Sequence, residues 1–136
     1  MQQELCLVTS AFLSDLPKDI NHPFLKRNTN SFRVTDSWSV LLNKSGFHKN
    51  HYHSEGWMSS PYYIKIPSVI DCFTKKEGWL KLGEPGFNMY KKIPVKKIIK
   101  PEEGKLIQFP SYMWHGTTAL KSDVERLTIA YDITPK

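Results

Sequence analysis

The hydrophobic residues near the start of the chain recur every three or four positions. These positions are Leu5, Val8, Phe12 and Leu16. Such spacing places them on one face of an α-helix, so we predict an amphipathic helix over residues 3–16, which Pro17 ends. Its apolar face is expected to pack on the rest of the domain or on a partner.

From Phe32 onward the period shortens to two, which is typical of β-strands; Trp38, Val40 and Leu42 are one example. The other predicted strands cover residues 47–53, 62–66, 69–73, 79–82, 95–99, 105–109, 113–118 and 126–133. Short strands at intervals of roughly 8–12 residues, separated by Gly and Pro, indicate an all-β sandwich or barrel. We predict a jelly roll, because that arrangement can bring distant strand ends around one opening.

The composition fits a single globular domain. The chain has 136 residues, of which 40% are hydrophobic and 12% aromatic, and this is enough to bury a core. We find no internal repeat and no interdomain linker. Residues 1–136 are therefore predicted to form one domain, in which residues 1–30 are the N-terminal helix and a loop.

The chain is mildly basic, with a net charge of +6 and an isoelectric point of about 9.3. This charge suits an anionic substrate or cosubstrate. Nucleic acid is not indicated as a partner, because the sequence contains no basic helix and no known nucleic-acid motif. Five lysines are predicted to form a solvated face or a charged edge strand rather than a phosphate site. They are Lys91, Lys92, Lys96, Lys97 and Lys100.

We expect a soluble, cytoplasmic protein without a membrane partner. The start of the chain contains Glu4 and lacks the basic region of a secretory signal. No apolar run approaches the roughly 20 residues that cross a bilayer. Cys6 and Cys72 are isolated from each other, so the sequence predicts neither a disulfide framework nor a cysteine-rich zinc site.

Three side chains that can bind metals stand at every second position in the middle of the chain: His51, His53 and Glu55. In an extended segment they would point to the same side. His115 could complete a site of two imidazoles and one carboxylate, the arrangement of many non-haem Fe(II) oxygenases. The spacing leaves open whether the first pair is His51 with His53 or His53 with Glu55. Glu55 could instead orient an imidazole, and zinc is the main rival metal.

Arg126 lies in a strongly strand-like run, and Thr128 shares its face. An arginine that faces the interior is costly unless it is paired. A fixed guanidinium can hold a small carboxylate through two hydrogen bonds, and the Thr128 hydroxyl can add a third donor. A structural salt bridge, for example to Asp123 or Glu125, is the alternative.

Several segments occur in the order and spacing of a known protein family. They are residues 37–40, 46–60, 62–63, 78–85, 104–117 and 125–132. They include His51-Tyr52-His53, Phe109-Pro110-Ser111-Tyr112-Met113-Trp114-His115 and Glu125-Arg126-Leu127-Thr128. With these motifs, residues 22–135 resemble the 2-oxoglutarate-Fe(II) oxygenase domains of bacteria and phages, which belong to the double-stranded β-helix superfamily.

The resemblance implies a double-stranded β-helix, cupin-like in form, and an Fe(II)- and 2-oxoglutarate-dependent dioxygenase that hydroxylates its substrate. It implies that His51, His53 and His115 are the catalytic iron ligands, with Glu55 as the alternative to His53. Arg126, Thr128 and Tyr63 would bind 2-oxoglutarate, and O2 would be the second cosubstrate. The expected substrate is anionic or proteinaceous. Because longer members carry supporting helices that this sequence lacks, a homo-oligomer or a partner subunit could take their place.

Two other classes of protein fit parts of the sequence. A cupin-like metal-binding module would keep the histidines but would not need Arg126. A structural or interaction β-sandwich would bind neither iron nor 2-oxoglutarate.

Overall fold

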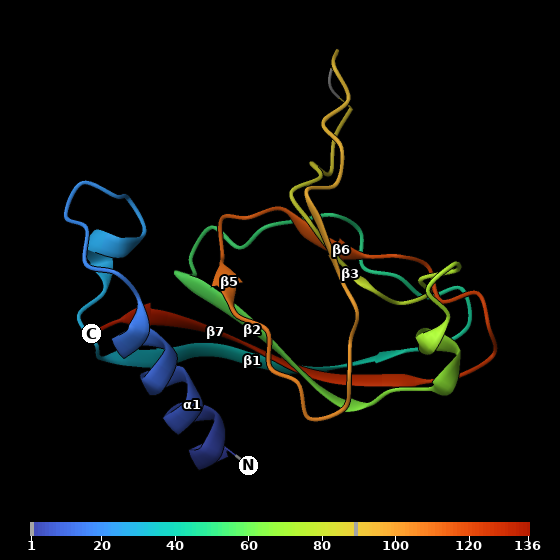
Figure 1. The fold of residues 1–136 in the computed structure, drawn as a ribbon, viewed down its shortest axis with the longest axis horizontal. Coiled ribbons are helices and arrows are strands. Elements are labelled where there is room, and N and C mark those ends of the chain that lie inside the picture. Colours follow the sequence, from blue (N-terminus) through green and yellow to red (C-terminus); the bar gives the residue numbers. More distant parts are fainter. Residues whose placement is uncertain (1, 89) are drawn as a thin grey trace.

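The fold is a sandwich of two antiparallel β-sheets with one α-helix packed on the outside (Figure 1). The computed structural model describes residues 2–88 and 90–136. The larger sheet has the order β1 (Phe32–Leu42), β7 (Arg126–Pro135), β2 (Met58–Lys65) and β5 (Phe109–Pro110). The smaller sheet has the order β4 (Lys97–Ile99), β3 (Leu80–Leu82) and β6 (His115–Thr117). This arrangement confirms the predicted all-β class with a short N-terminal helix.

The register of the larger sheet decides which residues face the space between the two sheets. Thr128 on β7 lies between Val40 on β1 and Tyr63 on β2. Two positions further along β7, Ala130 is paired with Trp38 on one side and Pro61 on the other. Because every second residue of a strand points to the same face, these side chains line one wall of the interior.

Four predicted strands differ in the structure. Residues 105–109 reach a strand only at Phe109, where β5 begins, and Leu106 makes an isolated bridge to Tyr62. Residues 69–73 do not form a strand; the 3-10 helix η2 (Ser68–Asp71) lies there, closed by the bond from Ile70 N to Pro67 O at 3.0 Å. Residues 47–53 contain a single β-bridge at His51. The backbone amides of His48 and His53 bond instead to the Thr117 hydroxyl and to Ser111 O, so no continuous ladder forms. Residues 95–99 form a strand only from Lys97 onward.

The N-terminal helix α1 (Gln2–Asp15) forms, but its buried face is shifted from the predicted one: Leu5 and Leu16 pack against the core cluster as expected, and Val8 and Phe12 do not. Val8 is 53% exposed and Phe12 37% exposed, whereas Thr9 and Leu13 are buried. The inward position of Thr9 has a clear cause, because its hydroxyl pairs with the Tyr131 hydroxyl at 2.9 Å. Because Thr9 faces Tyr131 on β7, the buried face of the helix includes a polar residue and is not the purely apolar stripe.

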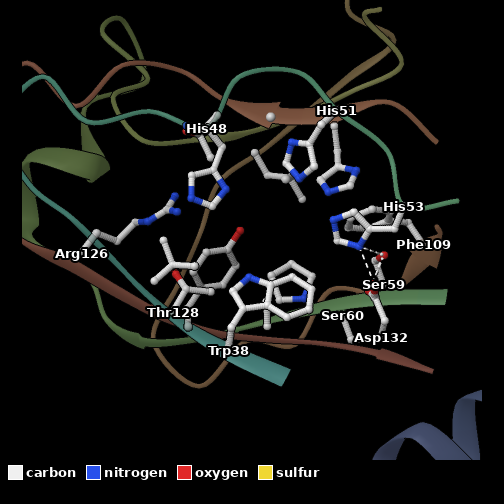
Figure 2. A pocket seen from close by; sticks show the side chains of 18 residues that line it. Trp38, His48, His51, His53, Ser59, Ser60, Phe109, Arg126, Thr128 and Asp132 are labelled. Carbon is white, nitrogen blue, oxygen red and sulfur yellow. Dashed lines mark hydrogen bonds and ion pairs between the residues drawn. The ribbon is translucent and has the colours of Figure 1, made fainter. Parts of the chain in front are cut away.

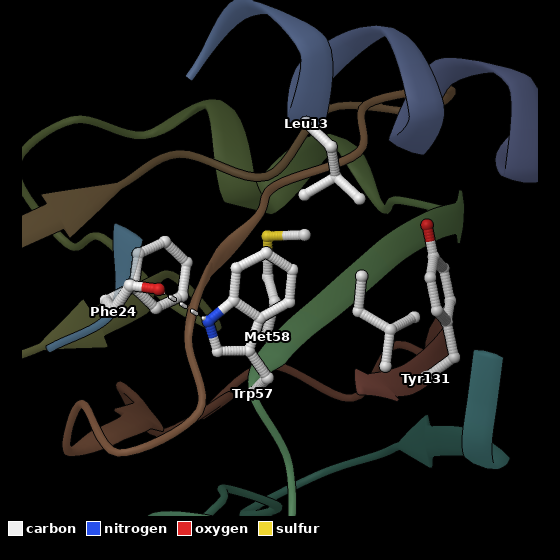
Figure 3. Close-up of a cluster of buried hydrophobic side chains, with 6 residues drawn as sticks. Leu13, Phe24, Trp57, Met58 and Tyr131 are labelled. Carbon is white, nitrogen blue, oxygen red and sulfur yellow. Dashed lines mark hydrogen bonds between the residues drawn. The ribbon is translucent and has the colours of Figure 1, made fainter. Parts of the chain in front are cut away.

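Leu13 anchors the helix in a hydrophobic cluster on the outer face of the larger sheet (Figure 3). The other buried members are Phe24, Trp57, Met58, Tyr131 and Ile133. The Phe24 and Trp57 rings stack with their centroids 4.8 Å apart, and Trp57 Nε1 donates a hydrogen bond to Phe24 O at 3.1 Å. The loop that follows the helix is thereby fixed to the start of β2.

Replacing Leu13 with alanine is expected to lower the free energy of unfolding by about 2–5 kcal/mol, because it removes a fully buried side chain. Leu7→Ala is the matched control on the same helix; Leu7 is 70% exposed, and its loss should cost less than about 0.5 kcal/mol. Urea unfolding measures both values. Equal effects would show that the helix does not pack as described.

One edge strand carries a lysine of the basic cluster, as the sequence predicted. β4 is an edge strand of the smaller sheet, and it carries the exposed Lys97, which fits a charged edge. Cys6 and Cys72 are both free thiols. No helix within residues 2–88 and 90–136 is long and apolar enough to cross a membrane.

Candidate metal centre

Three histidines meet between the two sheets, in a pocket lined by both of them (Figure 2). One nitrogen of each of His51, His53 and His115 lies within 4.8 Å of the corresponding nitrogens of the other two. The ring centroids of His51 and His115 are 4.2 Å apart, and those of His53 and His115 are 5.0 Å apart. Three imidazoles at these separations can bind one metal ion from the same side.

Backbone pairing brings the distant His115 to His51. The two residues exchange both main-chain hydrogen bonds, at 2.9 and 2.8 Å, so their side chains project to the same side. Gly116 makes this approach possible. A Cβ at that position would lie 2.7 Å from His48 O, too close for any other residue.

The three imidazoles are oriented by oxygen acceptors at their Nδ1 atoms. His51 Nδ1 lies 2.7 Å from Lys49 O, and His115 Nδ1 lies 2.9 Å from Met113 O. His53 Nδ1 lies 2.5 Å from the Asp132 carboxylate. An oxygen acceptor assigns the proton to Nδ1, which leaves the lone pair of Nε2 free to bind a metal.

Burial keeps His115 in the form that metals require. The residue is 8% exposed, and burial lowers its pKa to about 4, since a charged imidazolium would lose its hydration. His115 is therefore neutral at physiological pH, and no proton has to leave before a metal binds.

Glu55 lies outside this group. Its side chain is exposed, it does not line the pocket, and its Oε1 accepts a hydrogen bond from the Ser54 hydroxyl at 3.2 Å. The chain leaves the extended conformation after His53, so the two-residue period no longer applies there. Of the two open pairings, the geometry favours His51 with His53.

Arg126 occupies the same pocket, at the opposite end from His53 in the view of Figure 2. It is 3% exposed, and one of its terminal nitrogens donates to Gly78 O. Its Nε and the neighbouring Thr128 hydroxyl have no hydrogen-bond partner among the described residues. Neither Asp123 nor Glu125 pairs with it in the described structure, so the salt bridge considered above is absent.

Tyr63 closes this end of the pocket. The Arg126 guanidinium carbon lies 5.5 Å from the centre of the Tyr63 ring, within the range of a cation–π contact. Burial raises the pKa of Tyr63 to about 12, so its hydroxyl stays protonated. Two donors without partners and a buried cation beside a neutral phenol are suited to a small carboxylate.

Two pocket residues have no role in the sequence analysis. His48 lies between Arg126 and the histidine group, and burial, followed by the charges of Arg126 and His51, lowers its pKa. Asp132 contacts His53 from β7. A histidine three positions before His51 is a weak signal, and nothing in the sequence pattern links Asp132 to a residue 79 positions away.

Comparison with protein families gives one match. The family model described as "Putative 2OG-Fe(II) oxygenase" matches residues 36–132, which include all the pocket residues named above. No curated protein matches the chain in sequence.

Several solved structures share the fold. An oxidoreductase of the 2OG-Fe(II) oxygenase family from Burkholderia pseudomallei aligns with a TM-score of 0.59 and 13% identity, over 76% of this chain and 45% of that protein. HygX from Streptomyces hygroscopicus, with nickel and 2-oxoglutarate bound, gives 0.54 and 13%, over 78% and 59%. A Pseudomonas putida prolyl-4-hydroxylase gives 0.51 and 15%, over 74% and 52%. The chain thus spans about half the length of these proteins.

Proposed function

Because the chain belongs to the 2OG-Fe(II) oxygenase family, we propose that it is an Fe(II)- and 2-oxoglutarate-dependent dioxygenase that hydroxylates a C–H bond of its substrate. One observation carries the proposal. The pocket combines three metal-competent imidazoles with a buried arginine and a buried threonine whose donors lack partners. A cupin-like module that only binds metal would have no need for the second feature.

The pocket residues fit both Fe(II) and 2-oxoglutarate. His51, His53 and His115 would hold Fe(II) through Nε2, since each Nδ1 already has an oxygen partner. Arg126 Nε and the Thr128 hydroxyl would receive the distal carboxylate of 2-oxoglutarate. When bound, Fe(II), 2-oxoglutarate and O2 supply the oxidising chemistry, in which decarboxylation to succinate is coupled to substrate oxidation.

The rest of the pocket excludes water and holds the ligands in place. Val40, Leu80 and Phe109 give it apolar walls. Low polarity there strengthens the interaction of Arg126 with an anion. Tyr63 keeps its proton beside Arg126, so it carries no negative charge that would compete with the anion for the guanidinium.

Anaerobic titration with Fe(II) and then 2-oxoglutarate tests this proposal. We expect a visible metal-to-ligand charge-transfer band that saturates near one equivalent, and succinate after oxygen is admitted. The matched control is 2-oxovalerate, which has a methyl group in place of the distal carboxylate and should bind far more weakly.

Iron binding without the band would favour the metal-binding module. Binding of neither ligand would leave the structural β-sandwich. The substrate is expected to be anionic or proteinaceous, in keeping with the net charge of +6, and a homo-oligomer remains our expectation for the assembly.

A further inference from the structure

The Asp132 carboxylate lies directly behind one of the three histidines. Its Oδ2 is 2.5 Å from His53 Nδ1, and its Oδ1 accepts a hydrogen bond from the Ser59 hydroxyl at 2.7 Å. Figure 2 shows this contact at the end of the pocket away from Arg126. Asp132 is only 5% exposed, and its ion-pair partner in the described structure is His53.

The carboxylate is held firmly from the side away from His53. The Ser59 hydroxyl that bonds to Asp132 also bonds to the Ser111 hydroxyl at 3.0 Å, and Ser111 O accepts the His53 amide at 2.9 Å. Gly56 leaves room for this arrangement. A Cβ there would lie 2.9 Å from Ser111 Cβ and 3.3 Å from Asp132 Oδ2. Turning the Asp132 side chain away from His53 would therefore break its hydrogen bond to Ser59 and disturb the contact between Ser59 and Ser111.

His53 differs from the other two histidines in this respect. Lys49 O and Met113 O, the partners of His51 and His115, are neutral main-chain carbonyls. A carboxylate accepts hydrogen bonds only, so it fixes the proton of His53 on Nδ1 more firmly than a carbonyl does. It also increases the electron density that Nε2 can donate to a metal.

The negative charge of Asp132 matters because the three histidines that would hold the metal are neutral ligands. Fe(II) sites of this geometry usually contain one carboxylate ligand, whereas the three side chains here are all imidazoles. A buried carboxylate is costly unless it is well paired. Hydrogen bonding to Ser59 and His53 offsets that cost, and it places a negative charge one residue behind the site.

We propose that Asp132 is a positioning residue for the metal centre: it orients His53, fixes its proton on Nδ1 and supplies the charge that the three imidazoles lack. The inference rests on the proposed function, since it requires a metal at the three histidines. It adds a residue on β7 to a site whose ligands come from residues 51–53 and from β6.

Cobalt(II) binding without cosubstrate or turnover tests the proposal, because the visible bands of Co(II) report both affinity and coordination. We expect Asp132→Ala to weaken Co(II) binding by about 10- to 100-fold and to change the band shape. Asp132→Asn should lose several-fold, since its amide oxygen can accept the Nδ1 proton but carries no charge. The matched control is Asp36→Asn, an exposed aspartate that pairs with Asp132 in the register of β1 and β7.

The outcomes separate this inference from the proposed function. If the unaltered protein binds Co(II) and folded Asp132 variants bind it equally well with the same bands, Asp132 is only structural and the inference is wrong. If the unaltered protein binds neither Co(II) nor Fe(II), the proposed function fails, and the inference fails with it. Thermal unfolding of the metal-free variants identifies a folding defect. If Asp132→Ala does not fold, Asp132→Asn decides: weaker binding at unchanged stability supports the role, and unchanged binding overturns it.

Discussion

Replacing His115 with alanine is expected to weaken Fe(II) binding by more than about 100-fold, beyond the loss typical of a residue that only supports a ligand. His115 on β6 connects the smaller sheet to the segment that carries His51 and His53, because it pairs with His51 through both main-chain hydrogen bonds. Its side chain is one of three that can reach a common metal. Removing one of the three would leave only two side chains to hold the metal.

Anaerobic titration with Fe(II) and thermal unfolding with and without metal measure this effect. Metal at about 100 times its Kd should stabilise the unaltered protein by about 2.7 kcal/mol, and the same concentration should stabilise His115→Ala by less than about 0.4 kcal/mol. Two controls are matched to the variant. His22 is an exposed histidine that does not line the pocket, and His22→Ala should retain metal binding. Glu55→Ala should also retain it; a large loss there would mean that Glu55, not His53, is a ligand.

The second large effect is expected for Arg126→Gln, which should lose 2-oxoglutarate binding while it keeps iron. Removing one partner of a desolvated charge pair costs about 2–4 kcal/mol, which corresponds to roughly a 30- to 1,000-fold weaker affinity. Glutamine retains polar atoms but carries no charge. The variant should therefore bind 2-oxoglutarate no better than 2-oxovalerate, whereas the unaltered protein should strongly prefer 2-oxoglutarate.

Two further measurements and a surface control accompany the test of Arg126→Gln. Fe(II) affinity and thermal stability show whether the buried site survives the loss of the bond to Gly78 O. Arg33→Gln is the surface control, since Arg33 is exposed on β1, where its Nε bonds to the Thr134 hydroxyl at 3.1 Å. If Arg126→Gln keeps the preference for 2-oxoglutarate, Arg126 serves the fold and another group binds the cosubstrate.

Local pattern was sufficient for the elements that carry the site. The alternation over residues 126–133 predicted β7, and it placed Arg126 and Thr128 on one face, where both line the pocket. The run before Leu42 predicted β1. These strands are long, and the two-residue period places alternate residues on the same face, which is enough to group Arg126 with Thr128.

The sequence identified the three histidines as candidate ligands, but it did not predict how the backbone places them. The expectation of one extended strand through residues 47–53 was wrong, since one bridge at His51 and side-chain partners hold that segment. The choice between His53 and Glu55 depends on where the chain bends after His53. That bend follows from bonds to Ser111, Thr117 and His115, all more than 50 positions away.

By itself, then, the sequence determined the all-β class, the N-terminal helix and the residue types of a metal and carboxylate site, because each depends on periodicity or on side-chain chemistry. The tertiary structure alone decided which helix face is buried and which residue orients His53. Both depend on pairs of residues remote in the chain: Thr9 with Tyr131, 122 positions apart, and His53 with Asp132, 79 positions apart. No local pattern encodes such pairs, since they form only when α1 and the segment around His53 pack against β7.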